Sequence, residues 1–214
     1  MDDLSSRTLV EEAAQRVPAH SHGLQRFFSG TTLAEHWEWN HQPRADKWSL
    51  TARPGFLRLH AFQPLKSGDF WTVGDTISQR AWRTPENEVT AEFDLGALSD
   101  GQHPGLVHYG RTFCTLGVVQ SGTLGQLELN DNGKLTAGPA ITGDKIWLRS
   151  VWDWNRKSQF SFSFDGRRFT PVGDPYKLTW GRYRGDRIGV FTYNDLGEGG
   201  HVDLASFRHV LKRP

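Results

Sequence analysis

Short segments in which apolar and polar residues alternate recur along most of the chain, and turn residues separate them. Residues 89–95 read V-T-A-E-F-D-L, and residues 160–164 read F-S-F-S-F before the turn at Asp165 and Gly166. A period of two puts apolar side chains on one face of a strand and polar side chains on the other. About a dozen such segments, with no longer repeat period, predict an all-β, two-sheet antiparallel sandwich of the jelly-roll type and argue against a propeller or solenoid.

The composition agrees with short strands and tight turns. The 214 residues include nine tryptophans, 23 glycines and 10 prolines. The 25 basic and 24 acidic residues leave a formal charge of +1, so nothing draws the whole chain toward nucleic acid or acidic lipid. No apolar run is long enough for a transmembrane helix. The single cysteine, Cys114, excludes an internal disulfide and a cysteine-rich zinc site, and we expect a buried, unreactive thiol.

The chain divides into a short leading segment and one domain. Residues 4–16 carry apolar side chains at helical spacing and precede Pro18, which predicts a helix. We therefore expect a helix and linker over residues 1–26 and the β-sandwich over residues 27–214. No signal peptide is visible, so the expected location is the cytoplasm if the chain is complete.

One stretch is specific enough to suggest a family. Residues 37–43 read W-E-W-N-H-Q-P, residues 48–50 read W-S-L, and residues 53–59 read R-P-G-F-L-R-L. These motifs closely resemble the C-terminal concanavalin-like domain of glycoside hydrolase family 43 β-xylosidases, which is also classed as carbohydrate-binding module family 91. The hairpin sequence at 160–166 is similar as well, and the resemblance covers roughly residues 27–211.

The resemblance implies a concanavalin-like jelly roll and an accessory role. Full-length members of that family carry a five-bladed propeller ahead of this domain, and the propeller holds three acidic catalytic residues. The 26 residues ahead of the domain are too few to form a propeller, so we expect a non-catalytic chain. The implied partners are xylan or xylo-oligosaccharides and a family 43 catalytic propeller, and no cofactor is implied.

Two pairs of tryptophans are the first candidates for sugar contacts. Trp37 and Trp39 are two residues apart, which puts both on one face of a strand, and Trp152 and Trp154 repeat the spacing. Exposed indoles would stack on sugar rings, whereas the alternative is that at least one of the first pair lies in the core. The polar side chains expected to bind sugar hydroxyl groups are Asn40, His41, Gln79 and Arg80.

Two other functions compete with sugar binding. The domain could instead pack on the propeller and help to wall its pocket, with the loop 173–181 and its Tyr176 and Trp180 as the candidate contact. A third hypothesis makes the chain a hydrolase that uses Glu92 and Asp94, which share one strand face. Because no third acid follows at residue 96, a solvated strand face is the favoured interpretation.

Two charged groups have simpler interpretations. Asp203 is a candidate ligand for a structural Ca²⁺, although one carboxylate is far short of the six to eight oxygen ligands that calcium takes. The arginines at 182, 184 and 187 surround Asp186. Their charge is expected to be balanced by that carboxylate, which indicates a polar loop.

Overall fold

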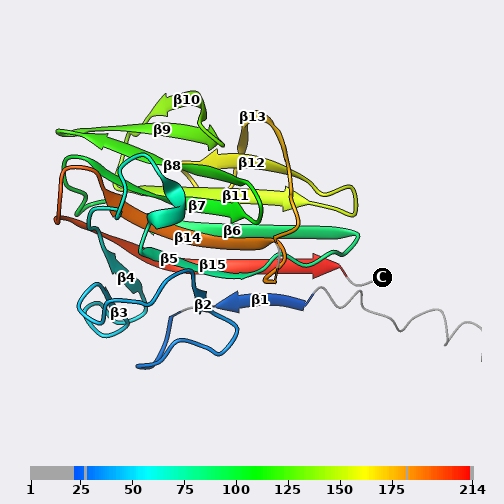
Figure 1. The fold of residues 1–214 in the computed structure, drawn as a ribbon, viewed down its shortest axis with the longest axis horizontal. Coiled ribbons are helices and arrows are strands. Elements are labelled where there is room, and N and C mark those ends of the chain that lie inside the picture. The colour runs from blue at the N-terminus through cyan, green and yellow to red at the C-terminus, as the bar shows by residue number, and fades with distance from the viewer. Residues whose placement is uncertain (1–21, 27, 182, 213–214) are drawn as a thin grey trace, which may run out of the picture.

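The chain folds as two antiparallel sheets in a computed structural model that describes residues 22–26, 28–181 and 183–212. The strands run along the long axis of the molecule (Figure 1). They are β1 His22–Arg26, β2 Glu38–Trp39, β3 Trp48–Ser49, β4 Leu57–His60, β5 Asp75–Arg80, β6 Glu86–Asp94, β7 Gln102–Tyr109, β8 Phe113–Ser121, β9 Leu124–Asp131, β10 Lys134–Ala140, β11 Lys145–Trp152, β12 Lys157–Ser163, β13 Thr170–Lys177, β14 Arg187–Asn194 and β15 His201–Lys212.

The eight-stranded sheet has the order β13-β12-β11-β6-β15-β4-β3, and β1 also pairs with β15. The seven-stranded sheet has the order β10-β9-β8-β7-β14-β5-β2. Strands that are distant in sequence are therefore neighbours in both sheets, as expected for a jelly roll. The predicted all-β, two-sheet antiparallel class is confirmed.

The main core fills the space between the sheets. Burial alternates strictly along β6, where Val89, Ala91 and Phe93 are buried between more exposed neighbours. Phe160 and Phe207 are among the largest fully buried side chains. The period-two pattern in the sequence thus identifies the face of β6 that packs against the second sheet.

A smaller apolar cluster covers the outer face of the seven-stranded sheet. The 3-10 helix η1 (Phe70–Thr72) lays Phe70 against Tyr109 and Phe191. This cover explains why β7 and β14 are buried on both faces rather than alternating. It also places Trp71, the next residue of η1, at the edge of this outer face.

Two expectations for the N-terminal segment need comment. The helix predicted over residues 4–16 lies outside the described residues. Residues 22–26, assigned to the linker from the sequence, form strand β1 and pair with Phe207–Leu211 of β15. Part of the segment expected as a linker therefore pairs with the eight-stranded sheet. Within the described residues, no helix is long and apolar enough to span a membrane.

Candidate functional site

The first tryptophan pair does not form an exposed platform. Trp37 is only 8% exposed, and its ring lies 4.9 Å from that of Phe207 and 6.2 Å from that of Phe28. Trp39, in β2, is half-buried and lies 5.5 Å from the ring of Trp48. Both indoles pack against the main core. Of the two interpretations left open by the sequence, the core one therefore describes Trp37.

The second pair is divided between the core and the surface. Trp152 is 2% exposed, and its Nε1 donates a hydrogen bond of 2.9 Å to the carbonyl of Trp82. Trp154 is 55% exposed in the turn that follows β11. In that turn Asp153 Oδ1 accepts a bond from the backbone N–H of Asn155. Trp154 therefore offers a free indole face, whereas Trp152 seals the end of the sandwich.

Three of the four predicted polar residues, Asn40, Gln79 and Arg80, line two adjoining clefts. The first cleft has a volume of about 460 Å³ and is lined by His36, Glu38, Gln79, Arg80, Trp82, Tyr183, Arg184, Arg187 and His209. The second has a volume of about 350 Å³ and is lined by Asn40, Trp71, Tyr109, Gly110, Gly181, Tyr183, Arg184, Gly185 and Arg187. Because three residues line both clefts, we treat the two as one feature, the candidate groove.

Each polar candidate has a distinct place relative to the groove. Arg80 is exposed, and its guanidinium lies 5.4 Å from the ring centre of Trp82. Gln79, on the same strand, is buried. Arg184 donates to the carbonyl of Trp39 at 3.0 Å and lies 3.5 Å from Asn40 Oδ1. The groove thus brings together three of the predicted residues: Asn40, Gln79 and Arg80.

The other candidates do not line the groove. His41 Nε2 is 2.7 Å from the carbonyl of Trp71 and so helps to hold η1 beside it. The groove's own aromatic residues are not among the sugar-binding residues predicted from the sequence. Trp71 is 36% exposed, Trp82 is 48% exposed and Tyr183 is 99% exposed. Trp82 was detectable only as an aromatic residue directly after the strand that carries Gln79 and Arg80.

A buried arginine lies where the two clefts meet. The side chain of Arg187 is 4% exposed, and its guanidinium is paired with the half-exposed carboxylate of Glu38. Burial lowers the pKa of Arg187. The Asp186 side chain, expected to balance the neighbouring arginines, is itself only 3% exposed, and burial raises its pKa. Both charged side chains are therefore buried, next to the exposed Arg184.

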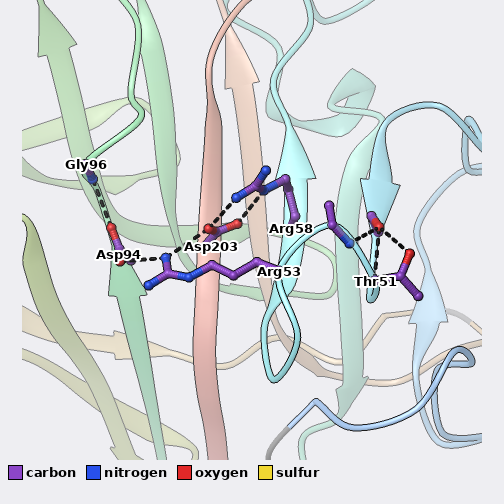
Figure 2. Close-up of polar contacts among 8 residues, drawn as sticks. Thr51, Arg53, Arg58, Asp94, Gly96 and Asp203 are labelled. Atoms are coloured by element: carbon purple, nitrogen blue, oxygen red, sulfur yellow. Dashed lines mark hydrogen bonds and ion pairs between the residues drawn. The ribbon is translucent and has the colours of Figure 1, made fainter.

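Asp203 is held by arginines rather than placed for a metal (Figure 2). Arg58 donates through Nε and Nη2 to the two carboxylate oxygens, each at 2.8 Å, and Arg53 Nη1 donates at 3.0 Å. Burial of Asp203 raises its pKa, but these bonds outweigh burial and hold the pKa below its usual value. Both oxygens are already engaged, so the calcium hypothesis loses its ligand. Within the described residues, no three His, Cys, Asp or Glu side chains are grouped for a metal.

The two acids of the hydrolase hypothesis are also paired. Asp94 Oδ2 accepts a bond of 2.7 Å from Arg53, and Glu92 Oε1 lies 3.5 Å from Lys145 Nζ (Figure 2 shows the Asp94 contact). Neither acid lines the candidate groove. This arrangement is that of an ion-paired strand face, whereas the interpretation favoured from the sequence is a solvated one.

The loop proposed for docking is also divided between interior and surface. Tyr176 is buried on β13, and its hydroxyl is 2.9 Å from Thr112 Oγ1. Trp180 is 41% exposed, and the guanidinium of Arg83 lies 4.2 Å from its ring centre. Cys114 is buried and free, as expected, and burial raises the pKa of its thiol.

Comparison with known proteins shows the family of this domain. The family model for the β-xylosidase C-terminal concanavalin A-like domain, a domain of glycoside hydrolase family 43, matches residues 25–209. The chain belongs to this family. A β-xylosidase from Formosa agariphila is 34% identical over an alignment of 209 positions that covers 87% of this chain and 35% of that protein.

Solved structures of family 43 enzymes contain the same domain. One is an engineered glycoside hydrolase that displays both endo-xylanase and exo-arabinofuranosidase activity. It is 25% identical with a TM-score of 0.79, over 92% of this chain and 41% of that chain. The Bacillus licheniformis protein BlXynB, 19% identical over 87% of this chain and 39% of its own, has the same fold with a TM-score of 0.74. This family 43 C-terminal domain thus spans only about a third to two fifths of the length of these relatives.

Proposed function

We propose that this domain binds xylan or xylo-oligosaccharides through the candidate groove, as a non-catalytic accessory to a family 43 catalytic domain. The observation that carries the proposal is the groove itself, in which exposed aromatic rings alternate with polar side chains. Trp71 and Trp82 offer apolar faces to the C–H groups of a pyranose. Asn40 and Arg184 offer an acceptor and donors to its hydroxyl groups. The Formosa relative, a β-xylosidase, indicates which sugar to test.

The chemistry predicts modest affinity. The groove is open and shallow, so a bound oligosaccharide keeps much of its surface in water. Micromolar to millimolar dissociation constants, roughly −8 to −4 kcal/mol, are expected. Of the residues predicted from the sequence, Asn40, Gln79 and Arg80 are assigned to ligand contact. Trp37, Trp39, Trp152 and His41 are assigned to supporting the groove or the core, and Trp154 lies outside it.

Calorimetric titration with xylohexaose, and with cellohexaose as the control sugar, tests the proposal. Trp82→Ala should weaken xylohexaose binding by at least fivefold, whereas Trp154→Ala should leave it unchanged. The two tryptophans are similarly exposed, at 48% and 55%, but only Trp82 lines the groove. A folded protein that gives no heat with xylohexaose would overturn the proposal, as would equal losses in both variants.

A second function is favoured by the aromatic residues at one end of the sandwich. The segments that carry Trp154 and Trp180 meet there, because Leu178 N–H donates to the carbonyl of Arg156 at 2.8 Å. The solved relatives are more than twice as long as this chain, which is consistent with packing on a catalytic domain. Under this alternative Trp180 contacts a family 43 propeller and helps to wall its pocket.

The docking alternative has its own test. The catalytic domain of a family 43 relative, produced separately, should co-elute with this domain in gel filtration. Trp180→Ala should weaken that complex, whereas Trp71→Ala, which changes a groove residue, should not. Separate elution of two folded proteins at micromolar concentration would count against docking.

A further inference from the structure

The floor of the first cleft contains unsatisfied hydrogen-bonding groups. Gln79 Nε2, Arg187 Nε and His209 Nε2 are buried and have no hydrogen-bond partner. Their residues are 6%, 4% and 2% exposed, and all three line the first cleft. A buried polar atom without a partner costs about 1–3 kcal/mol, and native proteins contain few of them. Three such atoms belong to residues that line one cleft, so a ligand that reaches them would supply the partners that they lack.

The chemistry of these three atoms indicates which hydrogen-bonding groups the ligand carries. The Gln79 amide nitrogen and Arg187 Nε are donors only, and His209 Nε2 donates in the tautomer that carries its proton there. Burial lowers the pKa of His209 to about 4, so its ring is neutral at pH 7. The missing partners are therefore acceptor oxygen atoms.

The charge of the first cleft indicates that the ligand is negatively charged. Three guanidinium groups, of Arg80, Arg184 and Arg187, face a single carboxylate, that of Glu38. The Glu38 carboxylate is half-exposed and already lies against Arg187, with Arg184 at 3.9 Å. The cleft therefore has an excess of positive charge, although the whole chain has a formal charge of only +1. Neutral sugar hydroxyl groups do not require this excess, whereas a carboxylate does.

The aromatic residues at the rim of the cleft indicate that the ligand also contains a sugar ring. Trp82 and Tyr183, 48% and 99% exposed, flank the arginines. An aromatic rim suits the apolar face of a sugar ring, so the ligand combines such a ring with a negatively charged acceptor group. We propose that the first cleft binds the carboxylate of a uronic acid substituent on a xylo-oligosaccharide, whose neutral backbone runs from Trp82 into the second cleft. This inference rests on the proposed function: the proposed function has the groove bind the xylan backbone, and the inference adds the group in the first cleft that binds its acidic substituent.

Calorimetry with three probes tests the inference. The probes are xylotetraose, xylotetraose that carries one glucuronic acid, and free glucuronate. We expect the acidic oligosaccharide to bind at least tenfold more tightly than xylotetraose at low salt. The preference should shrink as salt is raised, because exposed charges are screened. Free glucuronate should bind more weakly than either oligosaccharide.

Arginine variants identify the side chains that give the preference for the acidic oligosaccharide. Arg80→Gln and Arg184→Gln change exposed side chains, so both variants should fold, and together they should reduce the acid-to-neutral affinity ratio below threefold. Arg83→Gln is the matched control, because Arg83 is an exposed arginine near the groove that lines neither cleft. Its ratio should equal that of the unmodified protein.

The outcomes separate the two proposals. Equal binding of the acidic and neutral oligosaccharides overturns the uronic acid assignment but leaves xylan binding intact. Free glucuronate that binds as tightly as the acidic oligosaccharide overturns both, because the cleft would then be an anion site that ignores the sugar chain. An acid preference that survives the double variant also overturns the assignment to this cleft.

Discussion

Replacing Asp203 by Asn tests whether the carboxylate serves the fold rather than a metal. Asp203 accepts three hydrogen bonds from two arginines, at 2.8, 2.8 and 3.0 Å, and its side chain is 4% exposed. Asn keeps the shape but loses the charge and turns one acceptor into a donor that faces a guanidinium. The two arginines would then lie beside a group that repels one of them.

The expected loss in the free energy of unfolding of Asp203→Asn follows from these contacts. Breaking a buried ion pair by removing one partner costs about 3–5 kcal/mol. Arg58 and Arg53 are 20% and 39% exposed, so water replaces part of the loss. We therefore expect a loss of about 3 kcal/mol in the free energy of unfolding. For a domain of this size that corresponds to roughly 6–12 °C in Tm. The matched control is Asp94→Asn, which removes one bond from a side chain that is 20% exposed and should cost about 1 kcal/mol or less.

Urea and thermal unfolding measure this difference, with and without calcium and a chelator. The pKa of Asp203 is lower in the fold than in the unfolded chain. Its contribution is therefore fully present above the unfolded pKa of about 4 and is lost as the pH falls through the folded value. The gap between the two proteins should be constant from pH 5 to 8 and should close in acid. A stability that rises with calcium in the unmodified protein but not in Asp203→Asn would refute the reasoning.

Three further predictions concern stability. Trp37→Ala should cost about 3–5 kcal/mol, whereas Trp154→Ala should change the free energy of unfolding by less than about 0.5 kcal/mol, as urea unfolding would show. Burial raises the pKa of Asp75 to about 8, so the fold favours the neutral carboxyl group and loses stability as the pH rises through that value. Asp75→Asn should therefore raise Tm at pH 8.5 more than at pH 4. An equal rise at both pH values would contradict this. Gly110→Ala would force a Cβ against the Thr179 carbonyl oxygen, and the resulting shift of the backbone should lower Tm by several degrees. A Tm within 1 °C of the original would show that this close approach relaxes freely.

The sequence predicts the fold well because the pattern that determines a strand is local. The alternation of Val89, Ala91 and Phe93 needs no knowledge of the rest of the chain, and the structure buries the same residues. The spacing of Trp37 and Trp39 is equally local, but their burial is not. It depends on Phe207, which lies about 170 residues further along the chain.

The groove could not be predicted from spacing, because its walls come from separate segments. Asn40, Trp71 and Arg184 line one cleft but belong to three distant parts of the sequence. Arg187 was interpreted as part of a balanced polar loop because Asp186 precedes it. Asp186 is buried just before β14, and the charges that act on its carboxylate are those of Arg83 and Arg156, so it does not neutralise the arginines on the groove side.

The position of β15 has a consequence for biosynthesis. It is the last strand described in the chain, yet it pairs along its length with β6 on one side and with β4 and β1 on the other. During translation, β1, β4 and β6 emerge long before their shared neighbour, and their unpaired edges remain open to other chains. The eight-stranded sheet can close only when residues 201–212 have left the ribosome. The nascent domain is therefore most prone to aggregate just before synthesis reaches this strand, and chaperones that cover exposed edges would act in that interval.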